Sequence, residues 1–443
     1  MGNIGKTIRF LKRNGIVPTI YAVTERLLPP KGVPFDAEKT EEKTLTDSLM
    51  NSTERPFFSV LVPVYETNSQ FLEDMIESVL VQTYPDFELI LADASQTDNP
   101  KQVILSYEDE RINYLRLLEN KGISENTNEA LEAAKGDYCA LLDHDDILDP
   151  DALLWMAQEI CFEKSKGTDV KMLYTDEDKC DTNATKVYDP HFKQKLNLDL
   201  LLSNNYVCHF TAIKTSLLKE LKFREEYNGS QDHDLFLRAV GRILFPNGRY
   251  DGTKSEEIVH ISEVLYHWRC HEDSTAFNPA SKEYAYVSGR KAIGDFVKTY
   301  YGDVEVKDLL HKGFYRVEWP EDIFQIRPEL AAIGGFITDG RKITHGIINS
   351  DGSETFAGMN IHFSGYRHRA HVAQDVFGLD LRNLVPCESM KELFNSLMEG
   401  ISDENALERS ISFAKEAQKR HLLIMFDPVY NKSAKKLRKT HRY

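Results

Sequence analysis

The sequence lacks the cysteine pattern of a zinc site or a disulfide framework. Its 443 residues include 6 cysteines, which are scattered without a CxxC pair or a His/Cys cluster. A zinc site needs closely spaced ligands, so we expect reduced thiols and no structural zinc. The chain also lacks an apolar run of about 18 residues and the apolar core of a signal peptide, which predicts a cytoplasmic protein without a spanning helix.

Positive charge is scarce in most of the chain and is concentrated at its two ends. The net charge is −16, yet residues 1–27 carry +4 and residues 431–443 carry +6, which leaves −26 between them. An acidic body excludes a general nucleic-acid-binding protein, because such a protein needs a broad basic surface. Two basic ends instead indicate peripheral contact with an anionic membrane, here the inner face of the cell membrane.

The chain divides into segments of different character. We expect a basic amphipathic helical segment (1–28), a linker (29–55), a large αβ domain (56–300), a C-terminal accessory region (301–430) and a basic tail (431–443). In the first segment Ile4, Ile8 and Leu11 recur at i, i+4 and i+7 among basic residues. Such a helix either lies on a membrane surface or docks on the body of the protein.

Strand and helix patterns alternate from residue 57 onward. Short apolar runs at 57–63, 87–93, 112–117 and 137–142 suit buried strands, and helical patterns begin at Ser69, as the cap, and at Ile123. This alternation predicts an α/β fold with a mostly parallel central sheet and helices on both faces. Ligands bind beyond the carboxyl ends of such strands, where this chain places acidic residues: Glu66, Asp93 and Asp143.

The densest group of acids is Asp143-His144-Asp145-Asp146, directly after an apolar strand. Crowded carboxylates repel one another unless a cation neutralises them, and oxygen ligands suit Mg²⁺ or Mn²⁺. The alternative is an acidic helix N-terminus, since a helix opens at Pro150. Asp143 and Asp145 fit that alternative poorly because they precede the helix.

Three further motifs follow in the same frame. The segment 120–128 contains Gly122, which permits a tight turn before a helix with free amides. Asp232 stands where a helix opens and could serve as a general base. His267 and Arg269 could complete metal coordination and offset phosphate charge. Each motif alone is equally compatible with helix capping or surface charge.

In this order, the motifs resemble those of the family 2 glycosyltransferases, whose nucleotide-binding fold is called GT-A. The resemblance covers roughly residues 57–300. The segments Tyr174-Thr175-Asp176-Glu177-Asp178-Lys179 and Tyr188-Asp189-Pro190-His191-Phe192-Lys193 look most like those of bacterial rhamnosyltransferase-like enzymes of cell-surface polysaccharide synthesis. The GT-A domain would then be residues 56–300, followed by a smaller α+β region at 301–430.

The resemblance implies roles for individual residues. The nucleotide-sugar site would include Pro63, Tyr65, Glu66, Asp93, Asn120, Gly122, Asn128, Asp143, His144 and Arg269. Asp145 and His267 would bind the metal, and Asp232 would be the catalytic base, with Asp234 next in line. The acids at 176, 177 and 178 follow an expected strand at 171–174; they form either the acceptor side of the site or a solvated turn. The chain departs from the family at Ala94, where many relatives have a second acid, and at Asn126, where they usually have Ala.

The implied enzyme is an inverting, metal-dependent glycosyltransferase. It would move a sugar, rhamnose being the first guess, from a dTDP or UDP donor onto a lipid-linked or growing cell-surface polysaccharide. Residues 301–430 would bind acceptor or mediate assembly into a homo-oligomer. One alternative is a catalytically inactive GT-A scaffold in a polysaccharide assembly complex. A sugar nucleotidyltransferase is disfavoured because residues 66–69 are neither glycine-rich nor basic.

Overall fold

The computed structural model describes residues 3–27, 55–271 and 283–433, and the chain forms two compact units. The larger unit comprises Ala37–Leu196 and Asn205–Phe296. The smaller unit comprises Met1–Asp36, Asn197–Asn204 and Val297–Tyr443. Of the expected linker and basic tail, residues 29–54 and 434–443 lie outside the described residues.

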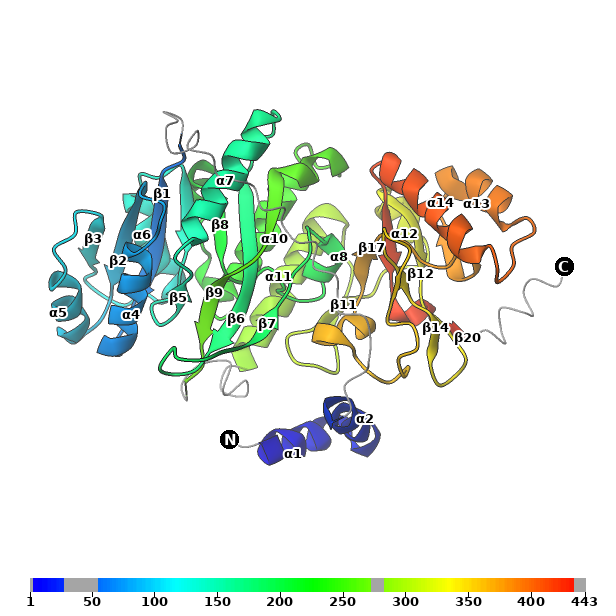
Figure 1. The fold of residues 1–443 in the computed structure, drawn as a ribbon, viewed down its shortest axis with the longest axis horizontal. Helices are drawn as coiled ribbons and strands as arrows, with labels where there is room; N and C mark the ends of the chain where they lie inside the picture. Colours follow the sequence, from blue (N-terminus) through cyan, green and yellow to red (C-terminus); the bar gives the residue numbers. More distant parts are fainter. Residues whose placement is uncertain (1–2, 28–54, 272–282, 434–443) are drawn as a thin grey trace. The chain divides into compact units, whose positions relative to one another are not determined.

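The larger unit is built on a nine-stranded sheet with the order β3-β2-β1-β4-β8-β6-β9-β5, and β7 pairs with β6 (Figure 1). Its strands are β1 (Phe58–Val64), β2 (Phe87–Asp93), β3 (Ile112–Arg116), β4 (Tyr138–Leu141), β5 (Ile147–Leu148), β6 (Met172–Cys180), β7 (Val187–His191), β8 (Thr211–Lys214) and β9 (Ile258–Arg269). The first four strands are parallel neighbours, as are β6 and β9. The predicted GT-A-like α/β sheet is confirmed.

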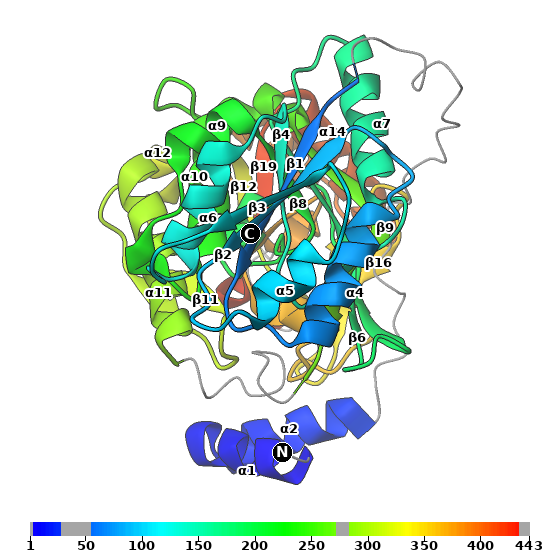
Figure 2. The same ribbon diagram turned by 90° about the vertical axis from the view of Figure 1, so that its left-hand side faces the viewer.

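Helices cover both faces of this sheet. They are α4 (Ser69–Leu80), α5 (Asn99–Leu105), α6 (Ile123–Ala133), α7 (Ala152–Ser165), α9 (Thr215–Leu221), α10 (Gln231–Leu244) and α11 (Glu283–Tyr300). Figure 2 shows α4, α5 and α7 on one face and α6, α9 and α10 on the other. Alternate side chains of β1, such as Val60 and Val62, pack against Leu72 and Met75 of α4, so both faces of the strand are buried. Helix α4 is capped by Asn68, whose side chain accepts from Gln70 N; the expected cap Ser69 is the first helical residue.

The smaller unit contains a four-stranded sheet with the order β17-β19-β12-β18. Its strands are β10 (Val306–Asp308), β11 (Tyr315–Val317), β12 (Leu330–Gly334), β13 (Ile337–Thr338), β14 (Ile343–His345), β15 (Ile347–Ile348), β16 (Glu354–Thr355), β17 (Gln374–Val376), β18 (Leu384–Pro386), β19 (Leu423–Phe426) and β20 (Lys432–Ser433). Its helices are α1 (Asn3–Asn14), α2 (Ile16–Leu27), α8 (Leu198–Leu201), α12 (Ile323–Ile326), α13 (Lys391–Met398) and α14 (Ala406–Lys419). The smaller α+β region expected at 301–430 is present, with strands such as β12, β14 and β15 and helices such as α13 and α14.

Segment 197–204 belongs to the smaller unit because buried polar bonds hold it there. The fully buried Arg327 donates to Asp199 and, through Nε at 2.8 Å, to Glu329 Oε1. Asn197 Nδ2 donates to the carbonyl of Asp375 at 2.7 Å and accepts from its backbone nitrogen at 2.8 Å. Buried charges are stable only when paired and hydrogen-bonded, as they are here.

The N-terminal residues form two helices, α1 and α2, joined at Gly15. The helix expected from the spacing of Ile4, Ile8 and Leu11 corresponds to α1, and α2 lies in the rest of the helical segment expected at 1–28. We call the pair the α1–α2 hairpin. None of the helices within the described ranges is both long enough and apolar enough to span a membrane.

Candidate active site

Three acidic residues follow the ends of neighbouring parallel strands, as the sequence predicts. Glu66 comes after β1, Asp93 ends β2 and Asp143 follows β4. The strand order β2-β1-β4 places these ends at one edge of the sheet. Pro63 lies inside β1, where it pairs with Ala92 and is buried. Tyr65 and Glu66 are the exposed residues that follow the strand.

Glu66 holds the loop that follows β2. Its carboxylate accepts from the backbone nitrogens of Gln96 at 2.6 Å and Thr97 at 3.0 Å, and from the Thr97 hydroxyl at 2.7 Å. The bonds from Thr97 lower the pKa of Glu66. The ionised side chain therefore fixes the shape of this edge.

Asp93 joins β2 to β3. The fully buried carboxylate accepts from Ser95 N at 2.8 Å, from the Tyr114 hydroxyl at 2.8 Å and from Arg116 Nη1 at 2.7 Å. A carboxylate held by three donors is rigid. A base or ribose at this edge would meet the surrounding Tyr114 and Arg116 as well as Asp93.

The segment 120–128 consists of a turn and the first residues of α6. Gly122 has φ +94, and a Cβ there would lie 3.0 Å from Asn228 Nδ2. Asn120 Oδ1 accepts from Gly122 N and from Asn126 Nδ2, both at 2.9 Å, which gives the unusual Asn126 a structural role. Asn128 donates to the Phe223 carbonyl at 2.9 Å and accepts from its backbone nitrogen at 2.8 Å. Asn128 is therefore a packing residue in this structure, because both ends of its amide are engaged.

The acidic residues after β4 lie in two different environments, because Asp146 is buried in the protein whereas Asp145 pairs with His271. Asp146 is buried and accepts from the Tyr266 hydroxyl and from Arg269 N, at 2.7 Å for the latter. Burial, and then the charges of Asp145 and Asp143, raise the pKa of Asp146 well above its usual range. Asp145 Oδ2 lies 2.9 Å from His271 Nε2, a partner that the sequence did not reveal. His144 is half-buried beside Asp145.

Arg269 supports this motif from inside the protein. It is fully buried, and its guanidinium donates to the carbonyls of Asp145 and Thr182 at 2.7 Å and to Asp74 Oδ2 at 2.9 Å. All of these bonds are internal to the protein, and they tie the acidic motif to α4. The role of Arg269 toward a phosphate stays a prediction.

The acids at 176, 177 and 178 lie within β6, so the expected turn after a strand at 171–174 is wrong. All three are buried, and each meets a histidine. Asp176 Oδ1 lies 2.8 Å from His260 Nε2, and Asp178 Oδ1 lies 2.7 Å from His267 Nδ1. This last bond orients the His267 ring and leaves Nε2 as the nitrogen that could bind a metal ion.

Glu177 is the centre of a cluster that the sequence did not single out. Lys193 Nζ lies 3.3 Å from Glu177 Oε2 and donates to the Val207 carbonyl at 2.7 Å. Burial alone would raise the pKa of Glu177, but Lys193 and hydrogen bonds from His191 and His209 hold it well below its usual range. Glu177, His191 and Lys193 belong to the two segments that carry the family resemblance, whereas His209 lies outside every motif quoted from the sequence. Only the fold shows that these four residues meet.

His209 connects this cluster to the acidic motif. Its Nδ1 lies 3.4 Å from Glu177 Oε2, and its Nε2 lies 3.7 Å from Asp143 Oδ2. The ring stacks on Tyr266 with centroids 4.6 Å apart. Asp143, Asp146 and His209 have ligand atoms within 4.8 Å of one another and form a candidate metal centre in the described part of the chain. Two carboxylates and an imidazole fit a divalent cation.

Asp232 lies in the first turn of α10, as predicted, and its Oδ2 accepts from Asn205 Nδ2 at 2.7 Å. After burial, the charges of Asp145 and Asp232 raise the pKa of Asp143, so Asp232 is close to the acidic motif. Asp234, the next candidate base, is buried between Arg224 and Arg238, with Oδ2 3.1 Å and 2.9 Å from their Nε atoms. Asp232 is therefore the better placed of the two acids to take a proton.

Comparisons with known proteins show what this part of the chain is similar to. Residues 59–222 match the family model described as Glycosyl transferase family 2. The chain is 40% identical over 242 residues to the uncharacterized protein y4gI of Sinorhizobium fredii, covering 54% of this chain and 25% of that protein. It is 30% identical over 278 residues to the O-antigen biosynthesis protein RfbC of Myxococcus xanthus, covering 62% and 20%. The chain thus spans a quarter or less of the length of these relatives.

Two further similarities are more distant. The chain is 26% identical over 264 residues to the chondroitin synthase of Escherichia coli, covering 57% of this chain and 34% of that protein. A crystal structure of S. aureus TarS 1-349 in complex with UDP-GlcNAc is 22% identical, covers 55% of this chain and 66% of that chain, and has a TM-score of 0.42.

Proposed function

We propose that this chain, whose residues 59–222 are a family 2 glycosyltransferase domain, is an inverting, metal-dependent transferase of polysaccharide biosynthesis. The observation that carries the proposal is the meeting of Asp143, Asp146 and His209 at the sheet edge, with Asp232 near enough for its charge to act on Asp143. Relatives named for O-antigen biosynthesis and chondroitin synthesis support a polysaccharide product.

The proposed reaction is a single displacement at the anomeric carbon of the donor sugar. Asp232 takes the proton of the acceptor hydroxyl while that oxygen forms the new glycosidic bond. The bond from the sugar to the nucleotide diphosphate breaks on the opposite face, so the configuration inverts. The sugar passes through an oxocarbenium-like transition state, as in glycoside hydrolysis. Asn205 keeps the Asp232 carboxylate in place through the 2.7 Å hydrogen bond.

The metal would be Mg²⁺ or Mn²⁺. Asp143, Asp146 and His209 are the candidate ligands whose atoms lie together. Asp145 and His267 would be further ligands, as the sequence predicts, with Asp178 orienting the His267 ring. A bound cation would neutralise charge on the departing diphosphate. The pKa of Asp146, raised by burial and its acidic neighbours, supports a cation there, because a positive charge would relieve that repulsion.

The donor would be a dTDP or UDP sugar, with rhamnose as the first guess. Asp93, Tyr114 and Arg116 would form the nucleotide edge with Glu66 and its loop. The acceptor would be a lipid-linked or growing cell-surface glycan, reached by peripheral contact with the inner face of the cell membrane. Residues 301–430 would bind that acceptor or support a homo-oligomer.

A screen of nucleotide sugars tests the proposal. Each dTDP and UDP sugar is added with Mg²⁺ or Mn²⁺, thermal unfolding is recorded, and sugars that stabilise are assayed for transfer. A matched donor at a hundredfold excess over its Kd raises the free energy of unfolding by about 2.7 kcal/mol. Stabilisation without transfer or hydrolysis by any donor would favour an inactive scaffold. No stabilisation with either metal would contradict the nucleotide-sugar site itself.

A further inference from the structure

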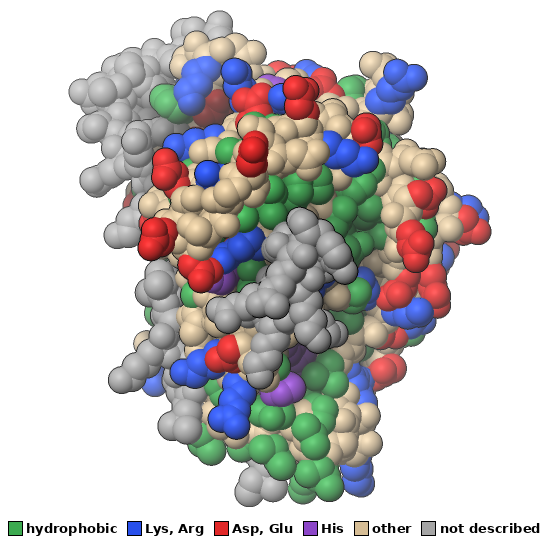
Figure 3. Space-filling view, turned by 90° about the vertical axis from the view of Figure 1, so that its right-hand side faces the viewer, with side chains coloured by type: hydrophobic (Ala, Val, Ile, Leu, Met, Phe, Trp, Pro, Cys, Tyr) green, Lys and Arg blue, Asp and Glu red, His purple; other side chains and the backbone are tan. Residues whose placement is uncertain are grey.

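The α1–α2 hairpin exposes an unusual number of large hydrophobic side chains. Six lie between residues 8 and 27, with exposed fractions from 38% for Leu11 to 73% for Leu27; the set is Ile8, Leu11, Ile16, Val17, Ile20 and Leu27. Single exposed apolar residues are normal on protein surfaces, but a contiguous group on one element marks an interaction site. Figure 3 shows hydrophobic side chains gathered at the lower end of the view, where the hairpin lies in Figure 1.

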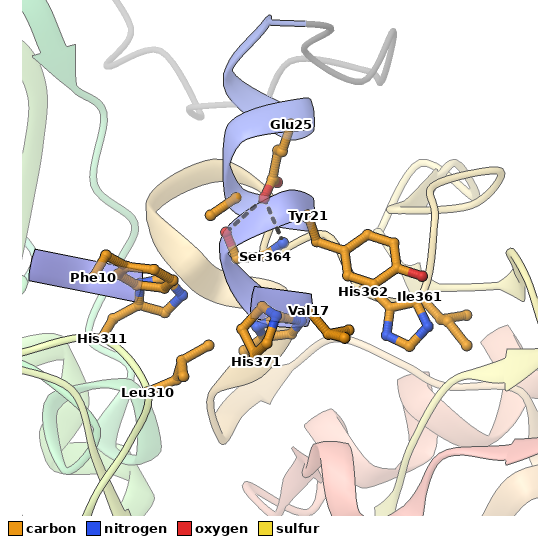
Figure 4. Close-up of a pocket in the computed structure, with 12 residues that line it drawn as sticks. Phe10, Val17, Tyr21, Glu25, Leu310, His311, Ile361, His362, Ser364 and His371 are labelled. Atoms are coloured by element: carbon orange, nitrogen blue, oxygen red, sulfur yellow. Dashed lines mark hydrogen bonds between the residues drawn. The ribbon is translucent and has the colours of Figure 1, made fainter. Parts of the chain in front are cut away.

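The face of α2 that meets the smaller unit is polar and aromatic. Glu25 accepts hydrogen bonds from Ser364 N at 2.9 Å, from the Ser364 hydroxyl at 3.0 Å and from Gly365 N at 2.8 Å (Figure 4). Tyr21 stacks on His362 with ring centroids 4.2 Å apart. These contacts fix the rotation of α2 about its own axis.

The contacts of α1 fix its rotation in the same way. The ring of Phe10 lies 5.8 Å from that of His311, and Arg13 donates to the carbonyl of Leu310. Both partners belong to the smaller unit. The hairpin is therefore held by Phe10, Arg13, Tyr21 and Glu25.

Helical geometry places the apolar residues away from these contacts. At 100° per residue, Ile16, Ile20 and Leu27 fall within about 40° of one another and lie roughly opposite Glu25. On α1, Ile8 falls roughly opposite Phe10, with Leu11 and Lys12 on either side of it. An ordinary surface helix packs its apolar face inward and shows polar residues outward. In this hairpin, by contrast, the face that carries Ile8, Ile16, Ile20 and Leu27 points away from the smaller unit.

The charge of the hairpin selects the kind of partner. Residues 1–27 carry +4 in a chain whose net charge is −16, and Lys12 and Arg26 are exposed beside the apolar face. An apolar face bordered by Lys and Arg is the composition of helices that lie in the interface of an anionic bilayer.

We propose that the outward face of the α1–α2 hairpin docks on an anionic lipid bilayer. Ile8, Leu11, Ile16, Ile20 and Leu27 enter the headgroup boundary, while Lys12 and Arg26 contact lipid phosphates. The inference deepens the membrane contact of the proposed function and rests on it, and it identifies the segment responsible. Phe10, Tyr21 and Glu25 keep the hairpin on the smaller unit during docking.

Vesicle flotation of the full chain tests this docking. The vesicles are phosphatidylcholine alone or phosphatidylcholine with about one third phosphatidylglycerol, since anionic lipid is the proposed attractant. We expect binding to the anionic vesicles that weakens with added salt and with neutral lipid. The double variant Ile16→Glu/Ile20→Glu should bind at least about tenfold more weakly. The control Leu105→Glu changes an exposed apolar residue of α5 by the same chemistry and should bind as the wild type does.

The outcomes separate this inference from the proposed function. Absence of binding by the wild type, or equal binding by the double variant, overturns the docking. A dimer in solution that the double variant abolishes would also overturn it and assign the face to a second copy. Donor-induced thermal stabilisation and transfer to a water-soluble acceptor are measured on the same proteins. If the double variant loses vesicle binding while donor-induced stabilisation and transfer persist, only the hairpin is affected. If vesicle binding persists in a protein that recognises no donor, only the transferase proposal fails.

Discussion

Asn205 Nδ2 donates a hydrogen bond to Asp232 Oδ2 at 2.7 Å, while Asp232 Oδ1 accepts from the backbone nitrogen of His233 at 2.8 Å. The carboxylate is thus held from both sides at the start of α10. Both carboxylate oxygens are engaged, which fixes the orientation of the group at the start of the helix. The role of Asp232 as general base can therefore be tested by a substitution that keeps its size.

Replacing Asp232 with Asn should abolish most transfer without weakening the donor site. The amide keeps the size of the side chain but cannot take a proton, and a general base contributes roughly 10²–10⁴-fold to the rate. We expect turnover to fall by that factor, while the donor-induced thermal shift stays unchanged. Asp169→Asn, at an exposed acid of the same unit, serves as the control. Near-normal turnover of the Asp232 variant would show that another group is the base.

Asp234 should behave as a stabilising residue. It is buried between Arg224 and Arg238, so Asp234→Ala leaves two guanidinium groups without their acid. We expect a loss of roughly 2–4 kcal/mol in the free energy of unfolding, below the value for a fully buried pair because both arginines are partly exposed. Urea unfolding measures it. A stable variant with lost turnover would instead give Asp234 a role in the reaction.

Arg269→Lys should weaken the metal site although Arg269 is not proposed to bind the metal. A lysine cannot reproduce the separate bonds to the carbonyls of Asp145 and Thr182 and to Asp74. We expect a lower melting temperature and weaker Mn²⁺-dependent stabilisation, because the acidic motif loses its support. Arg249→Lys, at an exposed arginine of the same unit, is the matched control. Unchanged Mn²⁺ stabilisation would contradict the supporting role.

The elements of the sheet could be read from the sequence because their apolar runs are nearly uninterrupted. The run at 57–63 corresponds to β1 (Phe58–Val64). The acids that follow the strands lie at the same edge of the sheet, as expected. The sequence predicts only the first part of β6, at 171–174, because Asp176, Glu177 and Asp178 are typical of a solvated turn. In the fold, His260 and His267 lie within hydrogen-bonding distance of Asp176 and Asp178, and Lys193 lies beside Glu177. Partners so distant along the chain leave no periodic signal.

The face by which a helix docks could not be read from the sequence either. The spacing of Ile4, Ile8 and Leu11 predicts an amphipathic α1, yet the pattern is the same whether the apolar face packs inward or outward. The contacts of Phe10, Tyr21 and Glu25 on other elements decide the question. Helix α2 lies in the second part of the expected helical segment 1–28, and its Pro18 stands in the first turn, where proline is tolerated.

Acidification should destabilise the smaller unit through His311, which lies under the hairpin. Its ring stacks on His368 at 3.6 Å, with Phe10 and Phe314 at 5.8 Å and 6.3 Å. Burial, the charge of His371 and that of Arg13 lower the pKa of His311 to about 4. Burial and neighbouring His311 likewise lower the pKa of His368 to about 3.

The sign of the effect follows from proton binding. Because the folded-state pKa lies below the usual value near 6.5, the unfolded chain binds more protons between about pH 4 and pH 6.5. Stability contributed by the neutral ring is complete above about pH 6.5 and is lost as the pH falls toward 4. At pH 5 the loss from His311 alone amounts to up to about 2 kcal/mol.

His311→Phe keeps an aromatic ring in the stack but cannot be protonated. We expect its melting temperature to fall less between pH 7 and pH 5 than that of the wild type, as recorded by scanning fluorimetry at several pH values. The control is His421→Phe at an exposed histidine of the same unit, which should retain the wild-type pH dependence. An identical fall in wild type and His311→Phe would show that His311 is not neutral in the folded state, or that the smaller unit does not limit thermal unfolding. The double variant His311→Phe/His368→Phe, melted over the same pH range, decides between these two. If the smaller unit does not limit thermal unfolding, this variant also keeps the wild-type fall in melting temperature.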